Sequence, residues 1–314
     1  MSYLSVWDFG RDGKANYSVH GIGEYPSKIR PIVISKIIER FSKIGDTVLD
    51  PFCGGGTVAV ECKLQGRNSI NFDINQKAIS LTKQRLDALT PAEIRSNTME
   101  AIKELKKGLQ TNLNSHNKFK QIQTKKEIES LEKRLITLKD TSSPYYKTTH
   151  ISVVKDARQL DLEKESIDAI ITDIPYASMI KYSDLPEDLS TIVNYNEFLR
   201  EISKAFAEMW QVLKKDKYCV IFVGDYRIAA SRKILPLHAD VIDKMTSLGF
   251  SLFDLYIWRY YRSGAFRPFG KKPFQAMNVH SYILVFHKPG SIKADKPNAD
   301  VKYRKRLIEK LKQN

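Results

Sequence analysis

Apolar residues recur along the chain with two spacings, one typical of helices and one typical of buried strands. Between residues 34 and 41 they follow the helical spacing, and a turn at Gly45-Asp46 then leads into a short apolar run at 47–49. The same reasoning predicts further helices over 58–64, 76–89, 195–213 and 237–248, and further strands over 69–72, 151–154, 167–171, 218–223, 251–258 and 281–287. Elements that alternate in this order predict an α/β fold: a doubly wound, Rossmann-like and mostly parallel sheet with an antiparallel hairpin at its C-terminal end.

Residues 90–149 break this alternation. Apolar residues lie at helical spacing on both sides of the polar stretch 112–117, namely Met99, Ile102, Leu105, Leu109 and Leu113 before it and Ile128, Leu131, Leu135 and Leu138 after it. The pattern predicts a helical hairpin inserted into an α/β domain. That domain would comprise residues 1–89 and 150–290, and a basic tail would follow at 291–314.

The chain is strongly basic. It has 51 lysine and arginine residues against 36 acidic ones, a formal net charge of +15. This excess favours a polyanionic partner, because cations docked on phosphates release counterions, although solubility alone would also explain the charge. Residues 258–272 hold five basic residues, five aromatic residues and no acidic one, a combination that suits bases stacked on rings and phosphates held by cations. For the basic hairpin, a solvated partner-binding surface and a direct DNA contact are equally compatible with the sequence.

Other compositional features exclude several classes of protein. The three cysteines are an odd number without C-x-x-C spacing, so neither a disulfide framework nor a zinc site is predicted, and no other metal site is expected. No apolar run approaches the roughly 18 residues that span a bilayer, and the first residues lack the pattern of a signal peptide. We therefore expect a cytoplasmic, intracellular protein without a membrane partner.

A glycine-rich turn follows the predicted strand at 47–49. Residues 50–57 read Asp-Pro-Phe-Cys-Gly-Gly-Gly-Thr and lead into a helix, the place where an open parallel sheet binds ligands. Neither the G-x-G-x-x-G nor the G-x-x-x-x-G-K-[ST] spacing is present, which argues against a standard dinucleotide site and against a P-loop. A glycine-rich turn alone is also compatible with a nucleotide-binding oxidoreductase. Asp73 and Asp156 end the next two strands, where one carboxylate can accept from a ribose and the other from an adenine amine. Each of these aspartates alone would more often be a cap or turn residue than a ligand, but three at successive strand ends favour a binding site.

Three segments together resemble a known family. Residues 20–28 (His-Gly-Ile-Gly-Glu-Tyr-Pro-Ser-Lys), residues 48–57 and the run Asp173-Ile174-Pro175-Tyr176 are similar to motifs of the amino-methylating DNA methyltransferases of the D-P-P-Y type, which use S-adenosylmethionine. The resemblance covers most of the chain except the hairpin and the tail. The donor motif precedes the catalytic motif, as in the alpha or gamma arrangement of that family.

The resemblance implies a role for each matching residue. Asp73 would hold the donor ribose, Asp156 the donor adenine, and the segment from Tyr25 to Lys28 the methionine end. The complete set expected to bind S-adenosylmethionine is Tyr25, Pro26, Lys28, Asp50, Phe52, Gly54, Gly56, Thr57, Asp73, Ile74, Asp156 and Ala157. The loop at 182–190 resembles a segment that lies near the target nucleotide in some of these enzymes.

The motif at 173–176 has a physical interpretation as a catalytic site. An exocyclic base amine is a poor nucleophile, and acceptors that hold its hydrogens, here Asp173 and the carbonyl of Ile174, localise its lone pair. Tyr176 would stack on a base flipped out of the duplex. The family usually has proline where this chain has Ile174, which still precedes Pro175 and is therefore steered towards an extended conformation. We expect a loss of rigidity at this position, not of the acceptor.

These observations predict a site-specific methyltransferase that modifies a base amine in double-stranded DNA. The aspartate at the first motif position favours adenine N6 over cytosine N4. Arg259, Arg262, Arg267, Lys271 and Lys272 are the expected DNA contacts. Two alternatives stay open: an RNA base-amine methyltransferase, and a catalytically weak DNA-binding subunit. A restriction or specificity partner is compatible with the sequence, which does not determine the oligomeric state.

Overall fold

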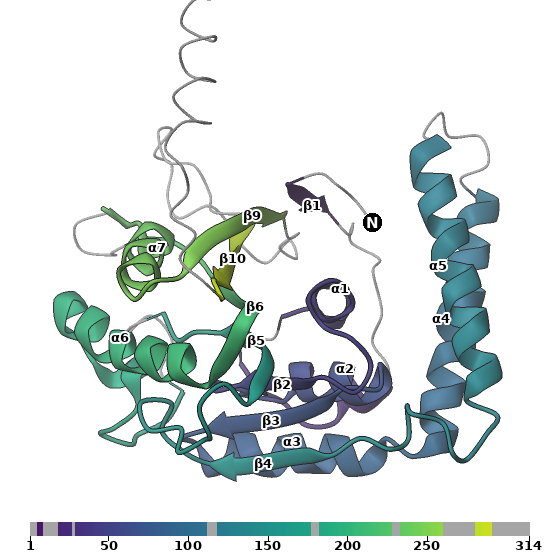
Figure 1. The fold of residues 1–314 in the computed structure, drawn as a ribbon, viewed down its shortest axis with the longest axis horizontal. Helices are drawn as coiled ribbons and strands as arrows, with labels where there is room; N and C mark the ends of the chain where they lie inside the picture. The colour runs from purple at the N-terminus through teal and green to yellow at the C-terminus, as the bar shows by residue number, and fades with distance from the viewer. Residues whose placement is uncertain are drawn as a thin grey trace, which may run out of the picture.

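The computed structural model describes residues 5–8, 18–26, 29–111, 118–176, 182–227, 233–259 and 280–290. Their largest feature is an eight-stranded sheet with the strand order β1-β9-β10-β6-β5-β2-β3-β4 (Figure 1). These strands are β1 (Val6–Asp8), β2 (Thr47–Asp50), β3 (Asn68–Asp73), β4 (His150–Val154), β5 (Ile167–Asp173), β6 (Leu213–Val223), β9 (Ser251–Arg259) and β10 (His280–Lys288). A small separate sheet pairs β7 (Tyr226–Arg227) with β8 (Ile234–Leu235).

The sheet is mostly parallel, as predicted. β2 pairs in parallel with β3 and β5, β3 with β4, and β5 with β6. The antiparallel hairpin of β9 and β10 is confirmed as well, and β10 pairs antiparallel with β6 on its other side. The carboxyl ends of β2, β3, β4, β5 and β6 therefore meet at one edge of the sheet.

Helices cover both faces of this sheet, because neighbouring residues of each central strand point to opposite sides. Val48, Ala169 and Val220 pack with α1 (Pro31–Phe41), whereas Leu49, Ile170 and Ile221 pack with α6 (Tyr195–Val212) and α7 (Leu237–Ser247). The remaining helices of the core are the short 3-10 turns η1 (Ser18–Gly21) and η3 (Leu189–Thr191), with α2 (Thr57–Leu64) and α3 (Gln76–Ala88). The doubly wound α/β fold class is thus confirmed.

Two features of the sheet differ from the sequence prediction. β6 begins at Leu213, not at 218, because the charged stretch after it stays in the sheet: Lys214 bonds Asp168 and the pairing with β5 shifts register there. Asp216 has φ +58 within this irregular stretch. β1 was not predicted, since three residues carry too little periodicity; Trp7 pairs in parallel with Trp258 and packs against Tyr256.

The inserted segment forms two long helices, α4 (Pro91–Thr111) and α5 (Lys118–Thr137), that lie side by side and project from the core (Figure 1). Their base lies at the amino ends of the parallel strands. Ser69 and His150, at the starts of β3 and β4, are register partners, and the ring of Tyr145 lies against Gly66, just before β3. Farther along the hairpin, Lys36 of α1 donates to Glu127 of α5 across 2.5 Å. The hairpin is therefore anchored at the edge of the sheet opposite the carboxyl ends of the strands.

Candidate active site at the carboxyl ends of the strands

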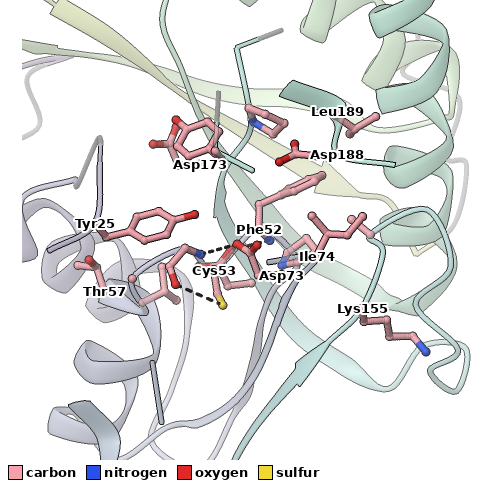
Figure 2. A pocket seen from close by; sticks show the side chains of 18 of the residues that line it. Tyr25, Phe52, Cys53, Thr57, Asp73, Ile74, Lys155, Asp173, Asp188 and Leu189 are labelled. Atoms are coloured by element: carbon pink, nitrogen blue, oxygen red, sulfur yellow. Dashed lines mark hydrogen bonds between the residues drawn. The ribbon is translucent and has the colours of Figure 1, made fainter. Parts of the chain in front are cut away.

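A solvent-open pocket lies at the carboxyl edge of the sheet, and the space within it, open solvent included, is about 900 Å³. Its acidic lining comes from segments far apart in the sequence: Asp50, Asp73 and Asp173 end β2, β3 and β5, and Asp156 follows β4. Figure 2 shows Asp73, Asp173 and Asp188 around the same space as Tyr25 and Phe52. The pocket is therefore suited to a ligand that carries positive charge and hydroxyl groups.

The glycine-rich turn forms one wall of this pocket. Gly54 and Gly56 have φ values of +49 and +75, the left-handed region that glycine adopts readily. The ring of Tyr25 packs so closely on Gly54 that an added Cβ would lie 2.7 Å from it. The turn ends at Thr57, where α2 begins. Glycine is thus required at position 54 both by the backbone conformation and by the aromatic ring above it.

Asp50 lines the pocket and is almost completely buried. Its Oδ1 accepts hydrogen bonds from the Thr172 hydroxyl at 2.7 Å and from the backbone of Phe52 at 3.2 Å. Burial raises the pKa of Asp50 to about 7, although both hydrogen bonds oppose that rise. Asp50 thereby connects β2 with β5, the strand that carries the second motif.

Asp73 holds the glycine turn in place. Its Oδ2 accepts from the backbone N–H of Gly54 at 2.9 Å, and its Oδ1 accepts from that of Asn75 at 2.8 Å. Burial raises the pKa of Asp73 to about 6. Each carboxylate oxygen keeps a further acceptor position, so the group can also accept from ligand hydroxyl groups.

Asp156 is held by a neighbouring arginine. Arg158 Nε lies 3.0 Å from both carboxylate oxygens and Nη2 lies 2.6 Å from Oδ2. The same guanidinium donates to Glu201 on α6 and to the carbonyl of Glu187. Asp156 therefore faces the pocket in a fixed orientation, and Arg158 connects it to the loop that follows the second motif.

The second motif begins where β5 ends. Asp173 and Pro175 line the pocket, and burial raises the pKa of Asp173 to about 8. Ile174 and Tyr176 are not part of the lining: the Ile174 side chain is 1% exposed in the core, and the Tyr176 ring lies near Gly224, after β6. The Ile174 side chain instead packs in the hydrophobic core beside the motif.

The loop after the second motif also lines the pocket, through Tyr182, Glu187, Asp188 and Leu189. Tyr182 stacks on Tyr25 with centroids 6.2 Å apart, and the buried Asp188 accepts from Ser183 and from the backbone of Ser190. Sequence reasoning placed this loop near a target nucleotide and assigned none of its residues to the donor. Its acidic and aromatic content was the available signal. Cys53 and Lys155 were missed too; Lys155 points away from the pocket towards Asp161 (Figure 2).

The remaining predicted residues fall into three groups. Phe52, Thr57, Ile74 and Ala157 line the pocket with those described above, whereas Pro26 and Gly56 do not. Arg259 ends β9, and its Nη1 lies 3.7 Å from Asp8 Oδ2. Five predicted residues lie outside the described part of the chain: Lys28, Arg262, Arg267, Lys271 and Lys272.

Within the described residues, no group of three or more His, Cys, Asp or Glu side chains is placed to hold a metal ion. Over the same ranges, no helix combines the length and the apolar character that crossing a bilayer requires.

The fold and this pocket define an α/β protein with an acidic pocket at the carboxyl edge of its sheet. The family described as DNA methylase, of the N6/N4 type, matches residues 2–84 and 167–313. The chain therefore belongs to the N6/N4 DNA methylase family, whose methyl donor is S-adenosylmethionine. The gap in the match contains the helical hairpin and β4.

Named methyltransferases are similar to this chain over part of its sequence. The type II methyltransferase M.MjaII of Methanocaldococcus jannaschii is 30% identical over 35% of this chain and 22% of its own length. The DNA adenine methyltransferase YhdJ of Escherichia coli K12 is 34% identical over 26% of this chain and 27% of its own. The chain thus spans about a quarter of the length of these relatives.

Solved structures are similar as well. The TTHA0409 protein of Thermus thermophilus, assigned as a DNA modification methylase and solved with S-adenosyl-L-methionine, is 28% identical. The match covers 47% of this chain and 58% of that one, with a TM-score of 0.34.

Proposed function

We propose that this protein transfers a methyl group from S-adenosylmethionine to an exocyclic amine of a base in double-stranded DNA, and that the amine is adenine N6. The observation that carries the proposal is the shared pocket: Asp50, Asp73 and Asp156 line the same space as Asp173 and Pro175. A donor site and an acceptor site must share one space for direct transfer between them.

The pocket residues suit the parts of the donor. Asp73 offers acceptors for ribose hydroxyls, and the adenine would be held by Asp156, Ala157, Phe52 and Ile74, which line the same pocket. Tyr25 and Thr57 lie beside the glycine turn (Figure 2), and with Asp50, which lines the same pocket, they suit the methionine end. S-adenosylmethionine, when bound, supplies an electrophilic methyl group on a positively charged sulfur. The acidic lining is complementary to that charge.

At the acceptor side, Asp173 and the carbonyl of Ile174 would accept the hydrogens of the target amine. An ionised Asp173 accepts more strongly than a protonated one, and it can take up the proton that the amine loses. Tyr176 provides an aromatic face for a base that has left the stack. The aspartate at the first motif position supports adenine over cytosine, and the net charge of +15 supports a nucleic acid substrate.

The proposal is tested by measuring transfer of a labelled methyl group onto duplex DNA and onto RNA, together with calorimetric binding of the donor. Asp173→Ala should abolish transfer and leave donor binding intact. Asp168→Ala is the matched control, because Asp168 lies on the same strand at its amino end, bonded to Lys214 and the backbone of Thr47. The Asp168→Ala variant should retain both methyl transfer and donor binding.

Three outcomes would contradict the proposal. Labelling of RNA but not of DNA would show the substrate class to be wrong. Donor binding without transfer to either nucleic acid would favour a binding subunit. Transfer by Asp173→Ala at the rate of the unaltered protein would remove Asp173 from the catalytic site.

A further inference from the structure

Arg85 lies behind the glycine turn and is completely buried. It belongs to α3, and its guanidinium makes five hydrogen bonds within the described residues. Nε and Nη2 both donate to the carbonyl of Ile22, at 2.9 and 2.7 Å, and Nη2 also reaches the carbonyls of Gly23 and His20 at 3.3 Å. Nη1 donates to the carbonyl of Gly55. All of these acceptors are backbone oxygens.

The four carbonyls belong to two segments that frame the pocket. His20, Ile22 and Gly23 precede Tyr25 by two to five residues, and Gly55 is the middle glycine of the turn. A Cβ on Gly55 would lie 2.8 Å from Arg85 Nη1 and 3.1 Å from Cβ of Tyr25, so the three residues are packed together. One side chain therefore connects the segment that carries Tyr25 to the turn that Tyr25 covers.

Charge makes this arrangement unusual. Burial lowers the pKa of Arg85, yet a guanidinium stays protonated in proteins, so a positive charge is buried against carbonyl dipoles. Neutral apolar packing would stabilise the core with less desolvation. A planar guanidinium, however, directs several N–H groups in fixed directions, and so it can hold two irregular segments at once.

A second contact anchors the same segment. His20 Nε2 and Glu61 Oε1 of α2 lie 2.9 Å apart, both buried. Beyond residue 23, Tyr25 extends over Gly54 and stacks on Tyr182. Displacement of the segment would therefore open the side of the pocket that we assign to the methionine end.

We propose that Arg85 is a positioning residue for the donor site, which holds the segment at 20–23 against the glycine turn so that Tyr25 closes the pocket. This inference rests on the proposed function only in taking the pocket as the donor site.

Arg67 provides a matched control for a purely structural role. It is also buried, and its guanidinium donates to the Ser42 hydroxyl, the Ser42 carbonyl and the Gln65 carbonyl. Burial lowers the pKa of Arg67 as well. Its contacts lie before β3, at the amino edge of the sheet and away from the pocket.

The test compares Arg85→Lys with Arg67→Lys in three measurements. Calorimetry gives the affinity for S-adenosylhomocysteine, and steady-state kinetics with DNA gives the donor KM and kcat. Chemical denaturation gives the free energy of unfolding. Lysine keeps the charge but cannot reach both segments with directed bonds. Arg85→Lys should weaken donor binding by about tenfold or more, the effect expected when bonds to a charged group are lost. It should raise donor KM by a similar factor and change kcat at saturating donor by much less. Arg67→Lys should lower stability without changing donor binding.

Equal donor affinity in Arg85→Lys and the unaltered protein would overturn the inference, as would equal losses of affinity in both variants. Should Arg85→Lys fail to fold, hydrogen exchange in the unaltered protein decides: S-adenosylhomocysteine should slow exchange of residues 18–26, and no slowing would overturn the inference. Failure of the proposed function has a different signature, because then the unaltered protein itself binds no donor.

Discussion

The hydroxyl group of Tyr176 donates a hydrogen bond to Oδ1 of Asp173 across 2.9 Å. The aromatic and the acidic residue of the candidate catalytic motif are thus coupled. Burial raises the pKa of Asp173 to about 8, and this bond opposes the rise because it stabilises the carboxylate. Tyr176 is therefore expected to tune the acceptor strength of Asp173 as well as to stack on a base.

Tyr176→Phe should shift the pH dependence of transfer to higher pH. The variant keeps the ring but loses the bond to the carboxylate, so Asp173 ionises at a higher pH and the rate rises later. A hydrogen bond to a charged group contributes about 1.5 kcal/mol or more, which corresponds to a shift of about one pH unit. Single-turnover rates across pH measure the shift, and an unmoved profile would show that Tyr176 does not act on Asp173.

Donor binding should strengthen as the pH rises. Burial raises the pKa of Asp50 to about 7 and that of Asp73 to about 6, so both groups hold protons below these values. A cationic donor favours their ionised forms, and its affinity should therefore increase from about pH 5 to about pH 8, with proton release on binding. Calorimetry in two buffers with different ionisation enthalpies measures the protons released.

Asp73→Ala should weaken donor binding by a few kcal/mol at most, because it removes hydrogen bonds to one ribose and to the glycine turn. Asp46→Ala, at the amino end of β2, is the control and should bind the donor normally. Unchanged affinity in Asp73→Ala would remove this residue from the donor site.

Ile174→Ala should slow transfer more than it weakens donor binding. The side chain is buried in the core beside the motif, and its truncation should also lower the free energy of unfolding by about 2 to 5 kcal/mol. Ile174→Val, which removes one methyl group, should have a small effect on both quantities. Equal transfer rates in Ile174→Ala and the unaltered protein would show that packing at this position does not support the acceptor carbonyl.

DNA affinity should fall steeply with salt. Replacement of Arg262 and Arg267 together with alanine should flatten the slope of log affinity against log salt by about one unit per lost contact. Lys164 and Lys215 are exposed at the amino edge of the sheet, and their double alanine variant is the control. An identical slope in the arginine variant would place the segment at 258–272 away from the DNA.

Replacement of Gly108–Lys133 with a short Gly-Ser linker should weaken DNA binding or change the oligomeric state without changing the methylated sequence. The hairpin is anchored at the edge of the sheet opposite Asp173, and its lysine-rich helices offer few side chains suited to bidentate base contacts. Sequencing that detects modified bases reports the sites. A folded, active variant that methylates different sequences would show that the hairpin reads the target.

The sequence predicted the parts of the site that depend on strand ends. Asp50, Asp73 and Asp173 each follow an apolar strand, and parallel strands bring their carboxyl ends to one edge without knowledge of any side-chain contact. The two spacings of apolar residues also sufficed for most helices and strands. The start of β6 at Leu213 was not predicted, because the charged residues that follow Leu213 are more typical of a turn than of a strand.

Other parts depend on long-range packing and left no pattern in the sequence. Arg85 is one arginine in an amphipathic helix, where such a residue normally faces solvent, and only the fold shows that backbone carbonyls surround it. Tyr182 and Asp188 reach the pocket because Arg158 and Asn75 hold their loop there. The anchoring of the hairpin at the amino edge likewise follows from the contacts of its base.

The most informative measurement is nucleoside analysis by mass spectrometry of duplex DNA incubated with S-adenosylmethionine and either the unaltered protein or Asp173→Ala. We predict N6-methyladenine in DNA treated with the unaltered protein and no modified nucleoside with the variant. N4-methylcytosine in place of N6-methyladenine would contradict the assigned target, and equal modification by both proteins would contradict the role of Asp173. DNA left unmodified by a protein that binds the donor would contradict the proposed activity itself.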